Sequence, residues 1–186
     1  MIDLSKLEEN IKIENHKKYW TIWYEKEKPI LEKVFRENLV EIQHIGSSSV
    51  EGLVSKPIVD VLIGLKSFEI TKNQIENIQN EGYEYFGQLH ETQKRFFARK
   101  RGDNNFNLQI VPYKDKEWWQ YLVFRDYLRN HQDAVNDYSK IKIEAANLGK
   151  EKLLEYHLHK EKVVKEILEK ATEWSLFEGI VKGNAN

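Results

Sequence analysis

The sequence feature that most constrains the fold is the apolar run Pro57–Leu65, PIVDVLIGL, which a single acid interrupts. Strands exposed on one face alternate apolar and polar residues, whereas this run is apolar at nearly every position. It predicts a central strand covered on both sides. An isolated carboxylate in such a strand is costly to bury unless it is paired, hydrogen-bonded or bound to a cation. Asp60 is therefore either a satisfied structural acid or a functional one.

The elements around this strand predict an α+β fold. A helix is expected from His16 to Asn38, kinked or divided by Pro29, followed by a strand at Val40–Ile45 and a polar loop at Gly46–Ser49. Further strands are predicted at Tyr83–Phe86, Arg95–Arg99 and Phe106–Val111. A short helix is predicted at Ile75–Ile78, ended by Gly82, and longer helices at Trp118–Arg129, 133–146 and 151–170. Asp133 is the expected cap of the helix 133–146, and Gly149 its expected end. The interpretation is one domain, 1–186, with a mixed-sheet core over about 11–115 and a helical C-terminal part over about 116–172.

Composition excludes some functional classes. Lys and Arg total 29 against 30 for Asp and Glu, a formal net charge of -1, so the basic excess typical of proteins that bind nucleic-acid phosphates is missing. No segment has the ~20 successive apolar residues that a membrane helix needs. There are no cysteines, and the charged N-terminal segment does not resemble a signal peptide. These features predict a cytoplasmic protein without a membrane or nucleic-acid partner.

A glycine-serine turn before the central strand indicates phosphate chemistry. Gly46 and Ser47 precede Asp60 with twelve residues between Ser47 and the acid. Glycine lets the backbone approach a phosphate closely, and the hydroxyls and N–H groups of Ser47 and Ser48 are donors for its oxygens. Asp60 would then hold a magnesium ion that bridges the phosphates. The alternative is an ordinary tight turn before a buried strand, with His44 as a structural histidine or as the residue that orients the turn.

Several cations are candidates for balancing phosphate charge. Lys56 is held extended by the following proline near the strand entrance, and it is either a phosphate ligand or a solvated loop lysine. Arg95 and Arg99 share one strand face and form either an anion clamp or surface decoration. Arg125 and Arg129 are a repelling i,i+4 pair on a helix, which predicts a partner outside the pair, either a carboxylate elsewhere in the fold or a ligand anion.

The block His44–Gly64, HIGSSSVEGLVSKPIVDVLIG, closely resembles the signature of the GrpB family. A second block, Phe124–His131, matches the other characteristic motif of that family, and the resemblance extends from about Ile11 to Ala171. The resemblance implies the nucleotidyltransferase fold. The family reaction is unsettled, so the resemblance predicts fold more securely than function.

The chain departs from a working nucleotidyltransferase at its acids. Such enzymes carry two acids one residue apart on the central strand, but Leu62 stands at the second position. The GrpB family tends to carry His-x-His on a neighbouring strand, where this chain has Asn107 and Gln109. Asn107 and Gln109 share one strand face and offer carbonyl oxygens but no charge. We expect Asp60 and Gln109 as magnesium ligands when a nucleotide supplies its phosphates, and no tight magnesium site in the free protein.

Two functions follow from these residues. One is a weak nucleotidyltransferase that transfers a nucleotidyl group to a small-molecule hydroxyl. The other is a catalytically degenerate module that binds a nucleotide or a protein partner. In both nucleotide-binding cases the expected phosphate ligands are Gly46, Ser47, Ser48, Lys56, Arg95 and Arg99, with Asp60 as the catalytic acid.

Overall fold

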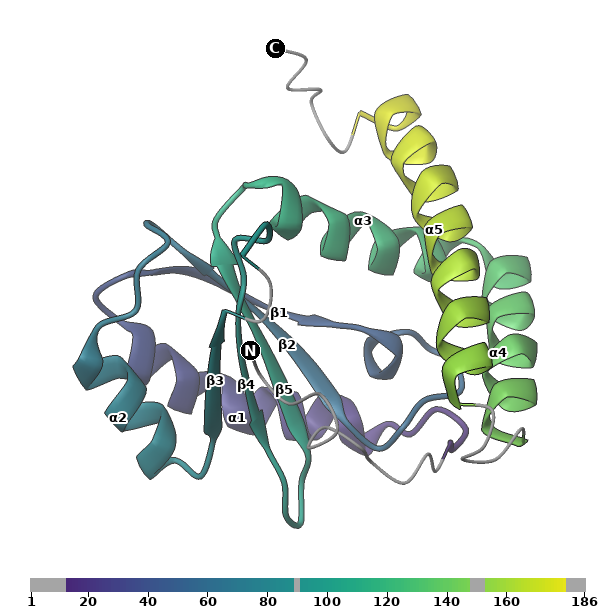
Figure 1. Cartoon of the computed structure of the whole chain (residues 1–186). Helices are drawn as coiled ribbons and strands as arrows, with labels where there is room; N and C mark the ends of the chain where they lie inside the picture. The colour runs from purple at the N-terminus through teal and green to yellow at the C-terminus, as the bar shows by residue number, and fades with distance from the viewer. Residues whose placement is uncertain (1–12, 89–90, 148–152, 180–186) are drawn as a thin grey trace.

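The structure is a computed structural model that describes residues 13–88, 91–147 and 153–179, and the side chains of 147 and 153–160 lie outside this description. Five strands and five α-helices follow one another as shown in Figure 1. Their bounds are α1 Tyr19–Phe35, β1 Leu39–Ile45, the 3₁₀ turn η2 Ser47–Ser49, β2 Val59–Leu65, α2 Lys72–Asn80, β3 Glu84–Gln88, β4 Phe96–Lys100, β5 Phe106–Pro112, α3 Lys116–Asn130, α4 Gln132–Asn147 and α5 Leu153–Phe177. The α+β class, with a mixed-sheet core and a helical C-terminal part, is confirmed.

The sheet has the strand order β1-β2-β5-β4-β3, which makes the predicted central strand an interior one. β2 is antiparallel to β1 and parallel to β5, so its backbone groups are hydrogen-bonded on both edges. Val61, Ile63 and Leu65 are fully buried on one face. Leu62 is fully buried on the other.

Two helical layers cover the two faces of the sheet. α1 and α2 pack on one face, where Trp20, Leu31 and Phe35 of α1 join the β2 side chains in the main core. On the other face α3 crosses one end of the sheet, and α4 and α5 stack on α3 (Figure 1). Trp118 of α3 lies so close to β2 that a Cβ on Gly64 would sit 2.7 Å from its ring. The rest of that face is left for a cavity.

Some element boundaries differ from those predicted. α1 continues through Pro29, because its buried face packs along the sheet and compensates for the lost backbone hydrogen bond. α4 begins at Gln132, so Asp133 is not the cap but lies in the first turn, where its charge complements the helix dipole. The predicted helix end at Gly149 and helix start at 151 lie outside the described residues. No helix of the described part is long and apolar enough to cross a membrane.

Two arginines of α3 join the helical part to the sheet. Arg125 is 8% exposed and donates to both carboxylate oxygens of Asp126, at 2.7 and 3.1 Å. It also donates to two groups of β1, Gln43 Oε1 at 2.8 Å and the carbonyl of His44 at 3.1 Å. Arg129 donates twice to the carbonyl of Ser49, at 3.0 and 2.8 Å. The predicted carboxylate partner exists, but it is the neighbouring Asp126 and not an acid from another element.

His44 connects β1 with α1 and with the 3₁₀ turn. Its ring stacks on Tyr24, with centroids 5.0 Å apart, and its Nε2 lies 3.1 Å from the hydroxyl of Ser48. Burial, followed by the positive charges of Arg129 and Arg125, lowers the pKa of His44 to about 3. The imidazole is therefore neutral at physiological pH and holds the turn by hydrogen bonding.

We predict that Arg125→Ala lowers the free energy of unfolding by about 3 kcal/mol, the low end for breaking a buried ion pair, because Asp126 keeps some contact with water. Urea denaturation measures the change. Arg36→Ala, which removes an exposed arginine, is the control and should unfold like the parent. Equal stability of all three proteins would contradict this role for Arg125.

A second prediction concerns acid stability. The folded pKa of His44 lies below its ordinary value of 6.5, so its contribution to stability is complete above pH 6.5 and falls as the pH drops toward 3. Over that interval the parent should lose up to about 1.4 kcal/mol per pH unit more than His44→Gln. Urea titrations at several pH values give the free energy of unfolding of both proteins. If that free energy falls equally with pH in parent and variant, His44 is not the source of the pH dependence.

Candidate functional site

The loop between β1 and β2 is built around a backbone that glycine permits. Gly46 has a φ of 70°, a left-handed value that other residues rarely adopt. The turn Ser47–Ser49 follows directly, and the Ser49 hydroxyl donates to the carbonyl of Gly46 at 2.7 Å. With Arg129 bound to the Ser49 carbonyl, the loop is held from inside and from α3.

Asp60 lies against this loop. It is paired with Ile45 in the β1–β2 ladder, and a Cβ on Gly46 would sit 2.4 Å from its Oδ2 atom. Its other oxygen accepts a hydrogen bond from the Asn107 amide at 3.0 Å. Asp60 is half-buried and not sealed in the core, so the strand acid and the glycine-serine loop form one site, as the sequence spacing predicts.

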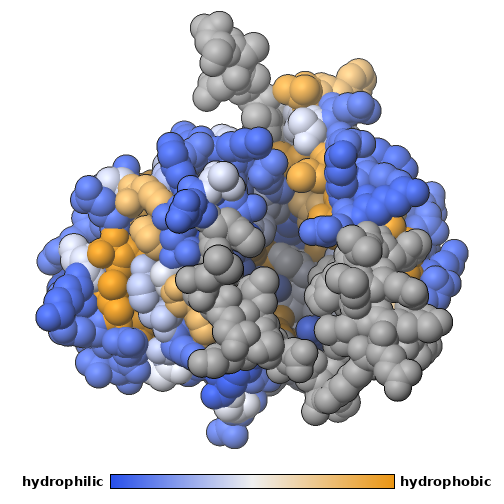
Figure 2. Space-filling view, in the orientation of Figure 1, coloured by the Kyte–Doolittle hydropathy of each residue, from blue (hydrophilic) through white to orange (hydrophobic). Residues whose placement is uncertain are grey.

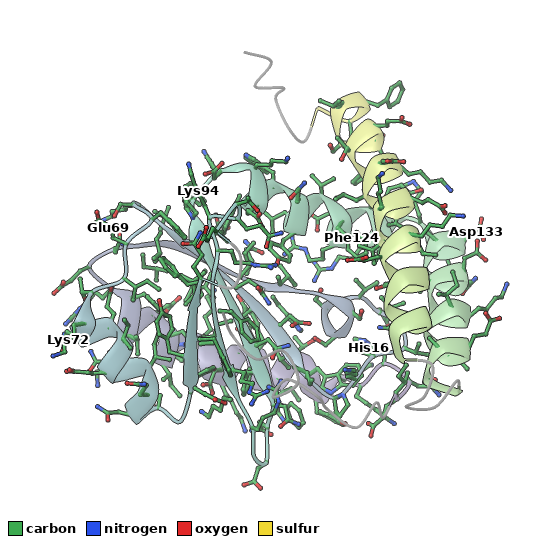
Figure 3. The ribbon with its side chains drawn as sticks, in the orientation of Figure 1. His16, Glu69, Lys72, Lys94, Phe124 and Asp133 are labelled. Carbon is green, nitrogen blue, oxygen red and sulfur yellow. The ribbon has the colours of Figure 1, made fainter. Side chains whose placement is uncertain are left out.

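A cavity of about 520 Å³ opens at this point. Gly46, Ser47, Asp60, Gln109 and Arg95 line its sheet side. Its helical side is formed by Glu117, Gln120, Tyr121 and Phe124 of α3, by Tyr138 of α4, and by Val164 and Leu168 of α5. Phe124 lies where α3 approaches α5 (Figure 3). The cavity thus has a polar floor and a helical wall that is apolar except at Glu117, Gln120 and the two tyrosine hydroxyls, a mixture that suits a small molecule.

Lys142 of α4 is not among the residues that line the cavity, but it contacts Ser47, which is. Its Nζ donates to Ser47 Oγ at 2.8 Å and also to the carbonyl of Val54, and it lies over the Tyr138 ring. The residue is 6% exposed. The sequence analysis did not include Lys142 in the site, because no sequence signal joins it to a serine 95 residues earlier.

Arg95 marks the opposite end of the cavity. Its guanidinium donates to the hydroxyl of Tyr121 and to Gln93 Oε1, the latter at 2.7 Å. The Tyr121 hydroxyl in turn donates to Gln109 Oε1 at 3.4 Å. Burial raises the pKa of Tyr121, which the charge of Arg95 partly opposes, so the phenol stays protonated. Sequence reasoning did not include Gln93 or Tyr121 in the site.

Three of the predicted phosphate ligands lie elsewhere. Ser48 is fully buried beneath the turn against His44. Lys56 does not line the cavity. Arg99 pairs with Glu84 at 3.0 Å and lies over the Phe86 ring, so the predicted clamp with Arg95 does not form.

The predicted metal ligands lie on one face of the sheet. Asn107 is level with Asp60 across the β2–β5 ladder, and Gln109 is level with Leu62. Leu62 packs with Ile45, Val111 and Trp118, so the second acid position of the strand belongs to the core. Within the residues that the structure describes, no three acids or histidines are grouped to hold a metal ion. The donors present fit at most one cation that brings further ligands with it.

The chain has relatives among known proteins. It is 29% identical over 158 residues to the glutamate-rich protein GrpB of Alkalihalophilus pseudofirmus, an alignment that covers 82% of this chain and 91% of that protein. It is 28% identical to the UPF0157 protein YqkA of Bacillus subtilis over 83% of this chain, but over 45% of that longer protein. Among solved structures, it superposes on the conserved protein GrpB from Enterococcus faecalis with a TM-score of 0.75 and 27% identity, covering 86% of this chain and 98% of that one.

The family model for the GrpB protein matches residues 10–170 of the 186. That span contains all five strands, the glycine-serine loop, Asp60 and the α3 and α4 residues that surround the cavity. The extent agrees with the resemblance found from the two sequence blocks. The chain belongs to the GrpB family.

Proposed function

We propose that this protein binds a nucleotide or a phosphorylated small molecule in the cavity, with the phosphates at Gly46, Ser47 and Lys142. The observation that carries the proposal is the 2.8 Å hydrogen bond from the Lys142 ammonium to Ser47 Oγ, within a loop that is open to the cavity. A buried ammonium beside a hydroxyl and a glycine backbone is a set of donors that suits phosphate oxygens.

Asp60 requires a cation if phosphates bind beside it. A carboxylate and a phosphate repel each other at short range, and Lys142 offsets only one of these charges. Magnesium carried by the nucleotide would be held by Asp60 with help from Gln109, and when bound it would neutralise phosphate charge. This requirement makes binding dependent on both magnesium and Asp60.

Nucleotidyl transfer by this site would be slow or absent. In that reaction a hydroxyl oxygen of the acceptor attacks the α-phosphorus, pyrophosphate leaves, and a base takes the hydroxyl proton. Asp60 is the strand carboxylate in the cavity, but it already accepts a hydrogen bond from Asn107. Leu62, packed in the core, supplies neither a second metal ligand nor a base.

A binding module without turnover is the second candidate function. Position 62 favours this binding module, because Leu62 is buried in the core and an acid could not replace it without repacking. The two functions share the ligand site and differ only in turnover. A single titration followed by product analysis separates them.

We predict that ATP or GTP binds more tightly with magnesium, and that Asp60→Asn abolishes this enhancement without loss of the fold. Calorimetric titrations of parent and variant, each with and without magnesium, measure it, and circular dichroism checks the fold. Binding that depends on neither magnesium nor Asp60 would contradict the metal role. Rapid magnesium-dependent release of pyrophosphate by the parent would contradict the prediction of slow or absent transfer.

We also predict that Lys142→Gln weakens nucleotide binding by roughly 10- to 150-fold, because a hydrogen bond to a charged group contributes about 1.5–3 kcal/mol. Lys140→Gln is the matched control, since Lys140 lies two residues away on α4 and is exposed, 3.5 Å from Asp137. The same calorimetric titration measures both variants below their melting temperatures. Equal losses in the two would place the phosphates elsewhere.

A further inference from the structure

Arg95 differs from other arginines that pack against this sheet. Arg99 is paired with Glu84 and Arg125 with Asp126. In the part of the chain that the structure describes, no carboxylate lies within 4 Å of Arg95, and the two oxygens that accept its hydrogen bonds are neutral, from Tyr121 and Gln93. Glu117 lines the same cavity but lies beyond 4 Å, so this partly buried cation has no ion pair to stabilise its charge.

The position of Arg95 separates it from the phosphate loop. Arg99, Asn107 and Asp60 lie level across β4, β5 and β2, and Arg95 precedes Arg99 by four residues on the same strand face. At ~3.3 Å per residue, the backbone of Arg95 lies ~13 Å along the strand from the row of residues that contains Arg99, Asn107 and Asp60. Gln109 lies on the row between them. A phosphate bound beside Ser47 and an anion bound at Arg95 would therefore be two different groups.

From this arrangement we propose that Arg95, Tyr121 and Gln93 form a second anion subsite, which binds the acidic group of a small hydroxylated acceptor. The inference rests on the proposed function for the identity of the other ligand, the nucleotide. An acceptor whose carboxylate or phosphate is held at Arg95 extends along Gln109, and its hydroxyl then lies toward Asp60. Arg95 provides its charge and its remaining N–H donors for such an acid, while Tyr121 and Gln93 fix the guanidinium in place.

The same network determines which acceptors are selected. An uncharged polyol of the same size leaves Arg95 without a counter-ion and gains no ion pair. A ligand with a cationic group at this end meets Arg95 directly and is repelled. The subsite therefore selects hydroxy acids or hydroxy phosphates over neutral and basic alcohols.

The test uses three probes that differ only at the acidic group: glycerate, glycerol 3-phosphate and glycerol. Calorimetric titration of each into the full chain, with and without saturating ATP and magnesium, measures affinity. We expect at least one of the two anions to bind at least ten times more tightly than glycerol. The comparison of glycerate with glycerol 3-phosphate tells which acid the subsite prefers.

Variants locate the binding. Arg95→Gln should weaken binding of the preferred anion at least tenfold and change ATP affinity less than twofold, and Tyr121→Phe should weaken anion binding by a smaller factor. The control Arg99→Gln removes an arginine from the same strand face outside the cavity and should change neither affinity. Thermal melts confirm that each variant is folded.

The outcomes separate this inference from the proposed function. Anion binding that depends on Arg95 without any binding of ATP would support the subsite and refute the nucleotide site. ATP binding with no preference for either anion over glycerol, or an anion affinity unchanged in Arg95→Gln, would overturn the subsite and leave the nucleotide site standing.

Discussion

The site depends on the contact between the Asp60 carboxylate and the backbone of Gly46. No side chain fits at position 46, because even a Cβ would lie 2.4 Å from Oδ2. The contact places the acid of an interior strand directly beneath the turn that follows the edge strand. The left-handed backbone of Gly46 turns the chain into the 3₁₀ segment, so one glycine satisfies both a steric and a conformational requirement.

Cations from the helical part hold the oxygens of this loop region. Arg125 reaches the carbonyl of His44, Arg129 reaches that of Ser49, and Lys142 reaches Ser47 and Val54.

Figure 2 shows a surface that is mostly hydrophilic, with apolar residues at the upper end of α5, where Leu176 and Phe177 are exposed. With 29 basic and 30 acidic residues, the protein is nearly neutral as a whole, yet Arg125, Arg129 and Lys142 all direct their charges at this loop region.

The local parts of this structure were predictable from the sequence. The apolar run around Asp60 predicts an interior strand, and the Gly46–Ser47 spacing to that acid predicts their shared cavity, because both signals lie within one strand-turn-strand unit. The roles of Lys142 and Tyr121 were not predictable, since each depends on where a distant helix packs. Arg99 was misjudged because strand alternation gives the face of a side chain but not its partner, which is Glu84 on the next strand.

The hydrogen bond between Lys142 and Ser47 joins residues 95 positions apart, and that between Arg129 and Ser49 joins residues 80 apart. During synthesis the sheet residues therefore leave the ribosome well before the helices that hold its loop. A ligand that contacts both Ser47 and Lys142 binds only after α4 has docked, so its binding energy adds to the stability of the docked helices. For such a ligand, occupancy of the site and attachment of the C-terminal helices would be thermodynamically linked.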